Sequence, residues 1–251
     1  MSSLHSFELA GVDGKPIRGD RSIGKDRQIL FITGFLSKRW GNKSKALAQW
    51  CEDKGWGFCC YDVRGCGDSG GTFTDYTLSD WIQDARGVVS TLIAGPPLTI
   101  VGNSLGGWIA WLVAQEYAIA EKLVLIAPAF NMMGVRAGSI SGERHHAWRT
   151  AGWMPWDDEP AHRDFPLAWK WVEESEAYWK TSFDRLRPVS TVILHGREDS
   201  VILPQGSSRF VEQVRSLVPS FPVELHLVAG DHRLSSPEHL NTFRRLVVGS
   251  T

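Results

Sequence analysis

Short apolar runs alternate with longer amphipathic stretches along most of this chain. The apolar runs cover residues 27–34, 57–63, 98–103, 122–128, 191–196 and 223–230, and Gly, Pro or Asp bounds them. Several are apolar on both faces, which is typical of parallel strands covered on both sides. Helical patterns cover residues 43–54, 77–94, 105–119, 204–217 and 236–248. The repeated order of strand and helix predicts an α/β fold with a doubly wound, mostly parallel sheet.

Two segments depart from this alternation. The stretch "HSFELAG" near the start predicts an antiparallel edge strand. Residues 129–187 contain no buried strand pattern but several helix-like pieces, such as "PLAWKWVEESEAYWK". We therefore expect residues 1–128 and 188–251 to form the α/β core, and residues 129–187 to form a helical cap or lid inserted across the top of the sheet.

Composition and charge exclude several classes of protein. A chain of 251 residues with 43% hydrophobic residues can bury a core without metals or disulfides. Its net charge of -1 gives no basic field for nucleic acid or an anionic membrane. No apolar run is long enough to span a bilayer, and no secretory signal is visible, so we expect a cytoplasmic protein. The oligomeric state is left open.

The four cysteines, Cys51, Cys59, Cys60 and Cys66, lie close together in the sequence. The paired spacing and nearby histidines of a metal site are absent. We expect small buried hydrophobes in a reducing compartment, with Cys59 and Cys60 on opposite faces of a strand.

Tryptophan is unusually frequent in this chain, with twelve residues. Six of them lie between positions 148 and 179. They could line an acyl or aromatic pocket, or they could pack the cap onto the core. We expect most of the six to serve packing and one or two to face substrate. Trp108 and Trp111, outside this cluster, are expected in the core.

The pentapeptide "GDSGG" at residues 67–71 matches the one that carries the nucleophilic serine of chymotrypsin-like proteases. Those enzymes place their histidine and aspartate well upstream of the serine, whereas only His5 precedes Ser69 here. The surrounding α/β pattern does not fit their β-barrels either. Ser69 is therefore predicted to be a loop residue.

The hexapeptide "GNSLGG" at residues 102–107 offers a second serine, Ser104, between an apolar strand and a helix. A strand, a sharp turn and a helix make up the nucleophile elbow that exposes a catalytic serine. Gly102 and Gly106 allow the strand and the helix to approach each other closely. Ser104 is predicted to be the nucleophile.

Partners for Ser104 follow in the order Ser, Asp, His that a nucleophile elbow requires. Asp199 and His232 each come just after a predicted parallel strand, where open α/β sheets place their functional groups. His232 would act as general base, and Asp199 would fix its tautomer. Glu198 and Asp231 are rival acids, although Asp231 is badly placed to reach the adjacent ring.

The oxyanion hole would consist of two backbone N–H groups. Leu105, directly after the nucleophile, should supply one, and the loop "TGFLS" after the first central strand should supply the other. Phe35 is the predicted donor in that loop, with Leu36 as the alternative.

These motifs together resemble the α/β-hydrolase superfamily over nearly the whole chain. "GNSLGG" is similar to its nucleophile elbow, "YDVRGCGDSGG" to its D-x-R-G-x-G-x-S loop, and "HGREDSVILP" and "GDHRLS" to its acid and histidine loops. The loop "ITGFLSKRWGNKSKALAQWCEDKGW" resembles a subgroup of compact serine esterases that includes mitochondrial acyl-protein thioesterases and acyl-glucuronide esterases. Thr33 replaces the histidine usual before the oxyanion glycine. In this superfamily the cap is usually inserted where residues 129–187 stand.

The resemblance and the residues imply a serine hydrolase that cleaves carboxylic esters or thioesters of small-molecule acyl substrates, without a metal or organic cofactor. Acyl transfer by the same three residues remains open. So does a ligand receptor or binding module on this fold with little turnover.

Overall fold

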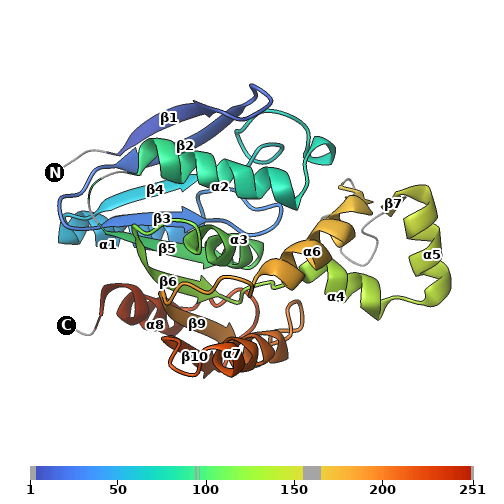
Figure 1. Cartoon of the computed structure of the whole chain (residues 1–251). Coiled ribbons are helices and arrows are strands. Elements are labelled where there is room, and N and C mark those ends of the chain that lie inside the picture. The colour runs from blue at the N-terminus through green and yellow to red at the C-terminus, as the bar shows by residue number, and fades with distance from the viewer. Residues whose placement is uncertain (1–3, 94, 96, 155–164, 250–251) are drawn as a thin grey trace.

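The central feature is an eight-stranded sheet, seen in a computed structural model that describes residues 4–93, 95, 97–154 and 165–249. Its strand order is β1-β2-β4-β3-β5-β6-β9-β10, and the neighbours from β4 to β10 pair in parallel. The parallel strands are β3 (Gln28–Ile32), β4 (Gly57–Tyr61), β5 (Leu98–Asn103), β6 (Ala120–Ile126), β9 (Ser190–Gly196) and β10 (Val223–Val228). The predicted doubly wound α/β fold is confirmed (Figure 1).

One edge of the sheet is antiparallel. The strand β1 (His5–Ala10) was predicted, whereas β2 (Pro16–Ser22), which joins β1 to β4, was not. The sequence "PIRGDRS" is too polar for the apolar pattern of a buried strand. Its Asp20 is nevertheless buried. The hydrogen bonds that its carboxylate accepts from Ser6 Oγ at 2.6 Å and Trp40 Nε1 at 2.8 Å compensate for the loss of water.

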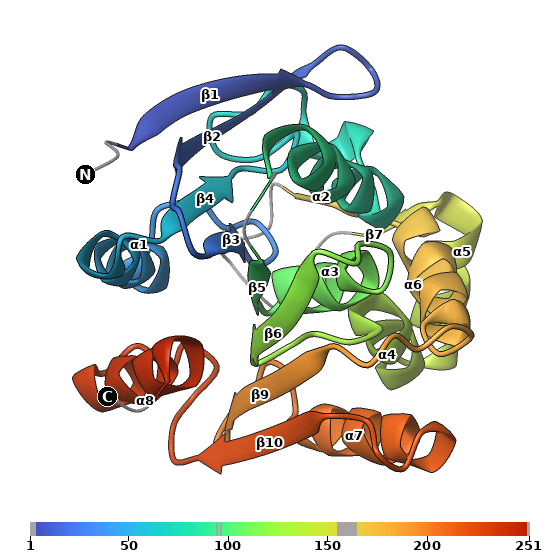
Figure 2. The same ribbon diagram turned by 60° about the vertical axis from the view of Figure 1, so that its left-hand side comes forward.

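Helices cover both faces of the sheet (Figure 2). On one face, α1 (Asn42–Lys54) and α8 (Pro237–Val248) pack against an apolar cluster that includes Cys60. On the other face, α2 (Leu78–Leu92), α3 (Leu105–Ala114) and α7 (Gln205–Leu217) pack against a larger cluster that includes Cys59. The two neighbouring cysteines thus lie on opposite faces, as predicted, because successive side chains of a strand alternate.

The helix α3 ends at Ala114, five residues before its predicted end. The following turn places the Ile119 carbonyl 2.9 Å from the Leu98 N–H, so that β6 starts beside β5. The predicted helix therefore ends early because its last residues are needed to return the chain to the sheet.

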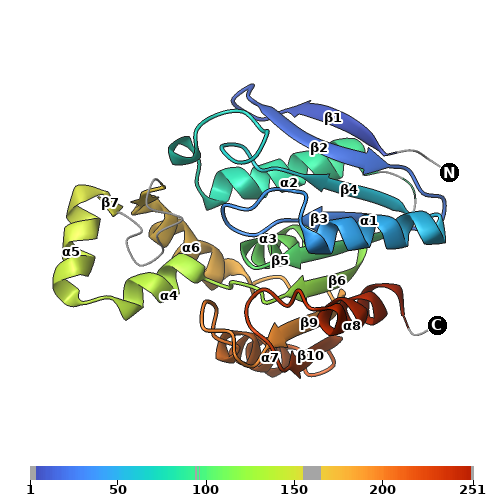
Figure 3. The ribbon, with the colours of Figure 1, turned by 180° about the vertical axis from the view of Figure 1, so that it is seen from behind.

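The segment 129–187 contains the helices α4 (Met132–Ser139), α5 (Gly142–Ala151) and α6 (Lys170–Thr181). It also contains a short antiparallel pair that was not predicted, β7 (Trp153–Met154) and β8 (Leu167–Ala168). In Figures 1 and 3 these helices lie beyond the carboxyl ends of the parallel strands. None of the helices among the described residues offers the 18-residue apolar stretch that would span a lipid bilayer.

Candidate active site

Ser104 lies on the sharp turn between β5 and α3, with φ of 54° and ψ of -123°. This conformation is strained for a residue with a side chain. The turn requires close contact between strand and helix, because a Cβ on Gly102 would lie 2.3 Å from the Gly106 carbonyl oxygen. A Cβ on Gly106 would lie 2.2 Å from the carbonyl oxygen of Thr33 in the loop after β3. The two glycines thus allow the turn that exposes the serine hydroxyl.

The three predicted catalytic side chains lie in one line. Ser104 Oγ is 3.2 Å from His232 Nε2, and His232 Nδ1 is 2.7 Å from Asp199 Oδ2. A carboxylate only accepts hydrogen bonds, so Nδ1 carries the proton of the neutral ring and Nε2 can accept the serine proton. Glu198, a rival acid, instead accepts a hydrogen bond from the Gly230 N–H. Asp231, the other rival, accepts from the backbone N–H groups of its own loop.

Asp199 is fixed on both of its oxygens. Oδ1 accepts the N–H groups of Val201 at 2.9 Å and Ile202 at 2.8 Å, while Oδ2 faces His232 and, at 3.1 Å, His195. Burial alone would raise the pKa of Asp199. The hydrogen bonds outweigh burial and hold that pKa well below its ordinary value, so the carboxylate remains ionised.

His195 is a residue of the site that the sequence reasoning did not assign. It is fully buried on β9, and its Nε2 faces two acceptors, Asp199 Oδ2 and the Ile202 carbonyl oxygen at 2.9 Å. Nε2 therefore carries the proton, and Nδ1 accepts from Ser207 Oγ at 2.8 Å. A histidine four residues before the acid, inside an otherwise apolar strand, was the available signal.

The loop after β3 passes close to the nucleophile, since a Cβ on Gly34 would lie 3.1 Å from Ser104 Cβ. Its next residues are Phe35, which lines the cleft beside Ser104, and Leu36, whose φ is 51°. Leu105 is the first residue of α3. The structure thus brings both predicted donor segments beside Ser104, while their role in holding an oxyanion stays a prediction.

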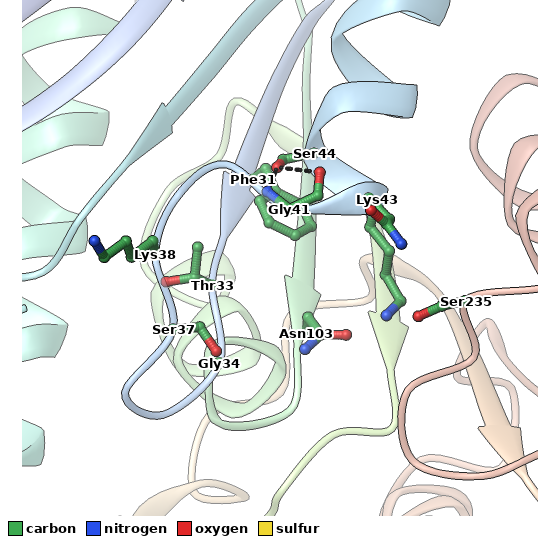
Figure 4. A pocket seen from close by; sticks show the side chains of 11 residues that line it. Phe31, Thr33, Gly34, Ser37, Lys38, Gly41, Lys43, Ser44, Asn103 and Ser235 are labelled. Carbon is green, nitrogen blue, oxygen red and sulfur yellow. Dashed lines mark hydrogen bonds between the residues drawn. The ribbon is translucent and has the colours of Figure 1, made fainter. Parts of the chain in front are cut away.

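Ser104 and His232 open into a cleft of about 720 Å³, a size usual for small-molecule sites. Part of its wall is apolar and comes from Phe130, Met132, Val135 and Ile202. Among the described residues that line the cleft, four are lysine or arginine and none is acidic. The four are Lys43, Arg136, Arg209 and Arg233. A side pocket of about 160 Å³ adjoins this cleft and shares Lys43, Asn103 and Ser235 with it (Figure 4).

The described tryptophans of the 148–179 cluster do not line this cleft. Trp148 and Trp171 are each 1% exposed, and Trp148 Nε1 donates to the Leu167 carbonyl at 2.8 Å. The expected packing role is therefore confirmed for these two, whereas Trp153 is exposed and Trp156 lies outside the described residues. Trp108 and Trp111 are fully buried, as predicted.

Ser69 is a loop residue, as predicted. Its hydroxyl donates to the Asp62 carbonyl at 2.6 Å and accepts the Arg18 N–H at 2.8 Å. Both contacts are to backbone groups, so this hydroxyl holds the loop together and has no general base among its partners.

Known proteins share this fold and sequence pattern. The mouse protein named palmitoyl-protein thioesterase ABHD10, mitochondrial, is 27% identical over 238 residues, which cover 93% of this chain and 76% of the relative. The solved structure of mouse alpha/beta hydrolase domain-containing protein 10 has a TM-score of 0.86 at 23% identity and 97% coverage of both chains.

A putative hydrolase from Agrobacterium vitis also has a TM-score of 0.86, at 24% identity, covering 99% of this chain and 98% of its own. Est1E from Butyrivibrio proteoclasticus, solved with ferulic acid bound, has a TM-score of 0.77 at 20% identity, covering 97% of this chain and 96% of its own. The model of the alpha/beta hydrolase family matches residues 29–248. With this match over most of its length, the chain belongs to the alpha/beta hydrolase family.

Proposed function

We propose that this protein is a serine hydrolase that cleaves carboxylic esters or thioesters through an acyl-enzyme on Ser104. The observation that carries the proposal is the line from Ser104 Oγ through His232 to Asp199, with distances of 3.2 and 2.7 Å. A hydroxyl, an imidazole and an ionised carboxylate in this order form an activated nucleophile.

In acylation, His232 Nε2 takes the Ser104 proton while Oγ bonds to the acyl carbon. The carbonyl oxygen gains negative charge, which the N–H groups of Phe35 and Leu105 stabilise by hydrogen bonds. The tetrahedral intermediate then breaks its bond to the leaving alcohol or thiol, and His232 returns the proton to that group. In deacylation, water takes the place of the leaving group and repeats the two steps, which releases the acid. Asp199 holds the ring and stabilises its charged form throughout.

The cleft and the relatives support this substrate class. The apolar wall beside Ser104 suits an acyl chain. The helix α4 supplies four of the residues that line the cleft, Met132, Val135, Arg136 and Ser139. Residues 129–187 therefore act as a cap that forms one side of the acyl site, and residues 1–128 and 188–251 act as the catalytic core. ABHD10 is named a palmitoyl-protein thioesterase, and this supports a thioester as well as an ester substrate. The expected cytoplasmic location stays a prediction, since the ABHD10 relatives are named as mitochondrial.

Intact-mass analysis after treatment with a fluorophosphonate tests the proposal. Wild type and Ser69→Ala should each gain one adduct, and Ser104→Ala should gain none. Hydrolysis of 4-nitrophenyl butanoate and of a butanoyl thioester should be lost in the same variant. A wild-type protein that gains no adduct and hydrolyses neither the ester nor the thioester would favour a ligand-binding role. An acyl product formed with an added alcohol or amine, in place of the free acid, would favour acyl transfer.

A further inference from the structure

Lys43 is a partly buried lysine that extends from the first turn of α1 to the loop that carries His232. Figure 4 shows its side chain directed towards Ser235, with Asn103 across the side pocket. Its Nζ donates a hydrogen bond to the carbonyl oxygen of Arg233. This carbonyl belongs to the peptide bond between Arg233 and Leu234, so the hydrogen bond fixes the chain one residue beyond the general base, His232.

Two physical effects make an ammonium unfavourable at this place. The N-terminal end of a helix carries partial positive charge, which repels a cation. Burial disfavours the charged form, and it lowers the pKa of Lys43 to about 8 even though Asp231 raises it. An apolar side chain of similar length would avoid both effects. A partly buried charge of this kind beside a reaction centre is a candidate for a functional role.

The loop of residues 229–236 needs contacts that fix its shape, because it has no regular secondary structure. Asp231 Oδ1 accepts the N–H groups of Arg233 at 3.0 Å and Leu234 at 3.2 Å. Leu234 has a φ of 42°, and its buried side chain anchors the loop in the apolar cluster below α1 and α8. The Arg233 carbonyl points the other way, towards the pocket, where Lys43 Nζ and Ser235 Oγ bind it.

We infer that Lys43 is a positioning residue, which keeps the His232 ring in line with Ser104 by holding the Arg233 carbonyl. This inference rests on the proposed serine hydrolase function. Lys43 itself does not touch the reacting atoms in this role. It acts on the distance of 3.2 Å between His232 Nε2 and Ser104 Oγ, which sets how readily the proton is transferred.

The charge state of Lys43 adds a pH dependence. Below pH 8 the ammonium makes a charge-assisted hydrogen bond, and above it the neutral amine makes a weaker one. The charged and titratable groups around it are Asp231, His232 and Arg233 in the histidine loop and Lys38 in the loop before α1. Activity should therefore fall as the pH rises through about 8.

The test compares Lys43→Met, Lys43→Arg and the matched control Lys45→Met, an exposed lysine on the same helix. With 4-nitrophenyl butanoate, Lys43→Met should lower kcat about tenfold and leave KM within about twofold, because ring orientation affects the chemical step. The midpoint of thermal unfolding should not fall, since a partly desolvated charge at a helix N-terminus is removed along with its hydrogen bond. The alkaline decline of kcat should disappear in Lys43→Met and move to higher pH in Lys43→Arg, whose charge persists. Lys45→Met should match wild type in all four measurements.

Three results would overturn the inference. One is an unchanged kcat and pH profile in Lys43→Met. Another is a raised KM with unchanged kcat, which would make Lys43 a substrate-binding residue. The third is a parallel loss of kcat and thermal stability that Lys43→Arg does not relieve, which would indicate a structural role. Fluorophosphonate labelling of Ser104 in wild type tests the proposed function separately. If wild type fails to label, both proposals fail, whereas labelling with an unchanged kcat in Lys43→Met removes the positioning role alone.

Discussion

The hydrogen-bonded line from Ser104 through His232 to Asp199 depends on how the Asp199 carboxylate is fixed in place. Four groups donate to this one carboxylate, two from the backbone and two from histidines. They keep the pKa of Asp199 well below its ordinary value, although burial alone would raise it. The negative charge therefore persists at every pH at which the enzyme would work. In the proposed mechanism it stabilises the charged His232 ring.

Replacing Asp199 by Asn removes that charge at nearly constant size. We expect kcat to fall by about a thousandfold or more with a small change in KM, because an amide can stabilise neither the reactive tautomer nor the imidazolium. Steady-state kinetics on 4-nitrophenyl butanoate measures this, with the exposed Asp26→Asn as control. A loss below tenfold would argue against the assigned acid.

The same variant has a pH-dependent effect on stability. A carboxylate whose folded pKa is depressed stabilises the fold fully above its unfolded value of about 4, and this stabilisation is lost as the pH falls through the folded value. Asp199→Asn should therefore lower the unfolding midpoint most at neutral pH and progressively less in acid. A difference in midpoint that stays constant from pH 7 to pH 3 would contradict this assignment.

His195 should affect the reaction through Asp199. In His195→Leu we expect kcat to fall about tenfold, because the carboxylate loses one donor and with it part of its fixed orientation. His226→Leu, on the exposed edge strand β10, is the matched control and should leave kcat unchanged. Equal kcat values in the two variants would remove His195 from the site.

At this scale the sequence was sufficient to predict that Ser104, Asp199 and His232 come together, because each comes soon after an apolar strand and their chain order fits a nucleophile elbow. Their catalytic roles stay a prediction. His195 could not be predicted in the same way. It lies within a strand, where a buried histidine is also compatible with ordinary packing. Its contact to Asp199 depends on how the acid loop folds back over the end of β9.

Among the elements, the contact between α3 and β3 sets the position of the nucleophile. The glycines of "GNSLGG" allow the helix backbone to touch the strand backbone, so no side chain can give way if one of them is enlarged. The geometry of the turn is therefore linked to the stability of the central layer.

Gly106→Ala tests this link. Its Cβ would lie 2.2 and 2.3 Å from the carbonyl oxygens of Thr33 and Ile32, so we expect a loss of more than about 3 kcal/mol in unfolding free energy. Gly138→Ala on α4 has nothing within 4 Å and should be neutral or stabilising by up to about 1 kcal/mol. Urea denaturation measures both. Equal unfolding free energies for Gly106→Ala and Gly138→Ala would show that the turn can open without cost.

Element prediction failed where tertiary contacts overrule the local pattern. The strand β2 is polar because its Asp20 and Arg18 serve neighbouring loops, so it lacks the apolar run of a buried strand. The end of α3 is set by the pairing of Leu98 with Ile119. Neither contact can be inferred from the residues within the element.

For the whole molecule, Arg64 connects three regions. Its side chain is 1% exposed, its Nε is 2.6 Å from Asp84 Oδ1 on α2, and its Nη1 is 2.8 Å from Asp13 Oδ1 in the β1–β2 turn. Its guanidinium also lies over the Tyr76 ring at 4.8 Å. The loop after β4 is thereby tied to the helical layer and to the antiparallel edge.

Arg64→Met should destabilise the fold by about 3–5 kcal/mol, because it leaves the Asp84 charge buried without a partner. Adding Asp84→Asn should recover part of that loss. Arg86→Met, which breaks the exposed pair with Glu116, should cost less than about 1 kcal/mol. A urea denaturation series measures all four proteins. A double variant less stable than Arg64→Met would contradict this account.

The chain order of the site has a consequence for how activity is acquired. Ser104 belongs to β5 and α3 near the centre of the sheet, whereas Asp199 and His232 follow β9 and β10 at its far edge. Parallel pairing of β6 with β9 joins segments that residues 129–187 separate in the sequence, and long-range pairing of this kind forms slowly in folding. The hydroxyl can thus be placed before any base exists to activate it. During refolding, reactivity towards a fluorophosphonate should lag behind the return of helical ellipticity, so the rate of labelling reports when the last strands have joined the sheet.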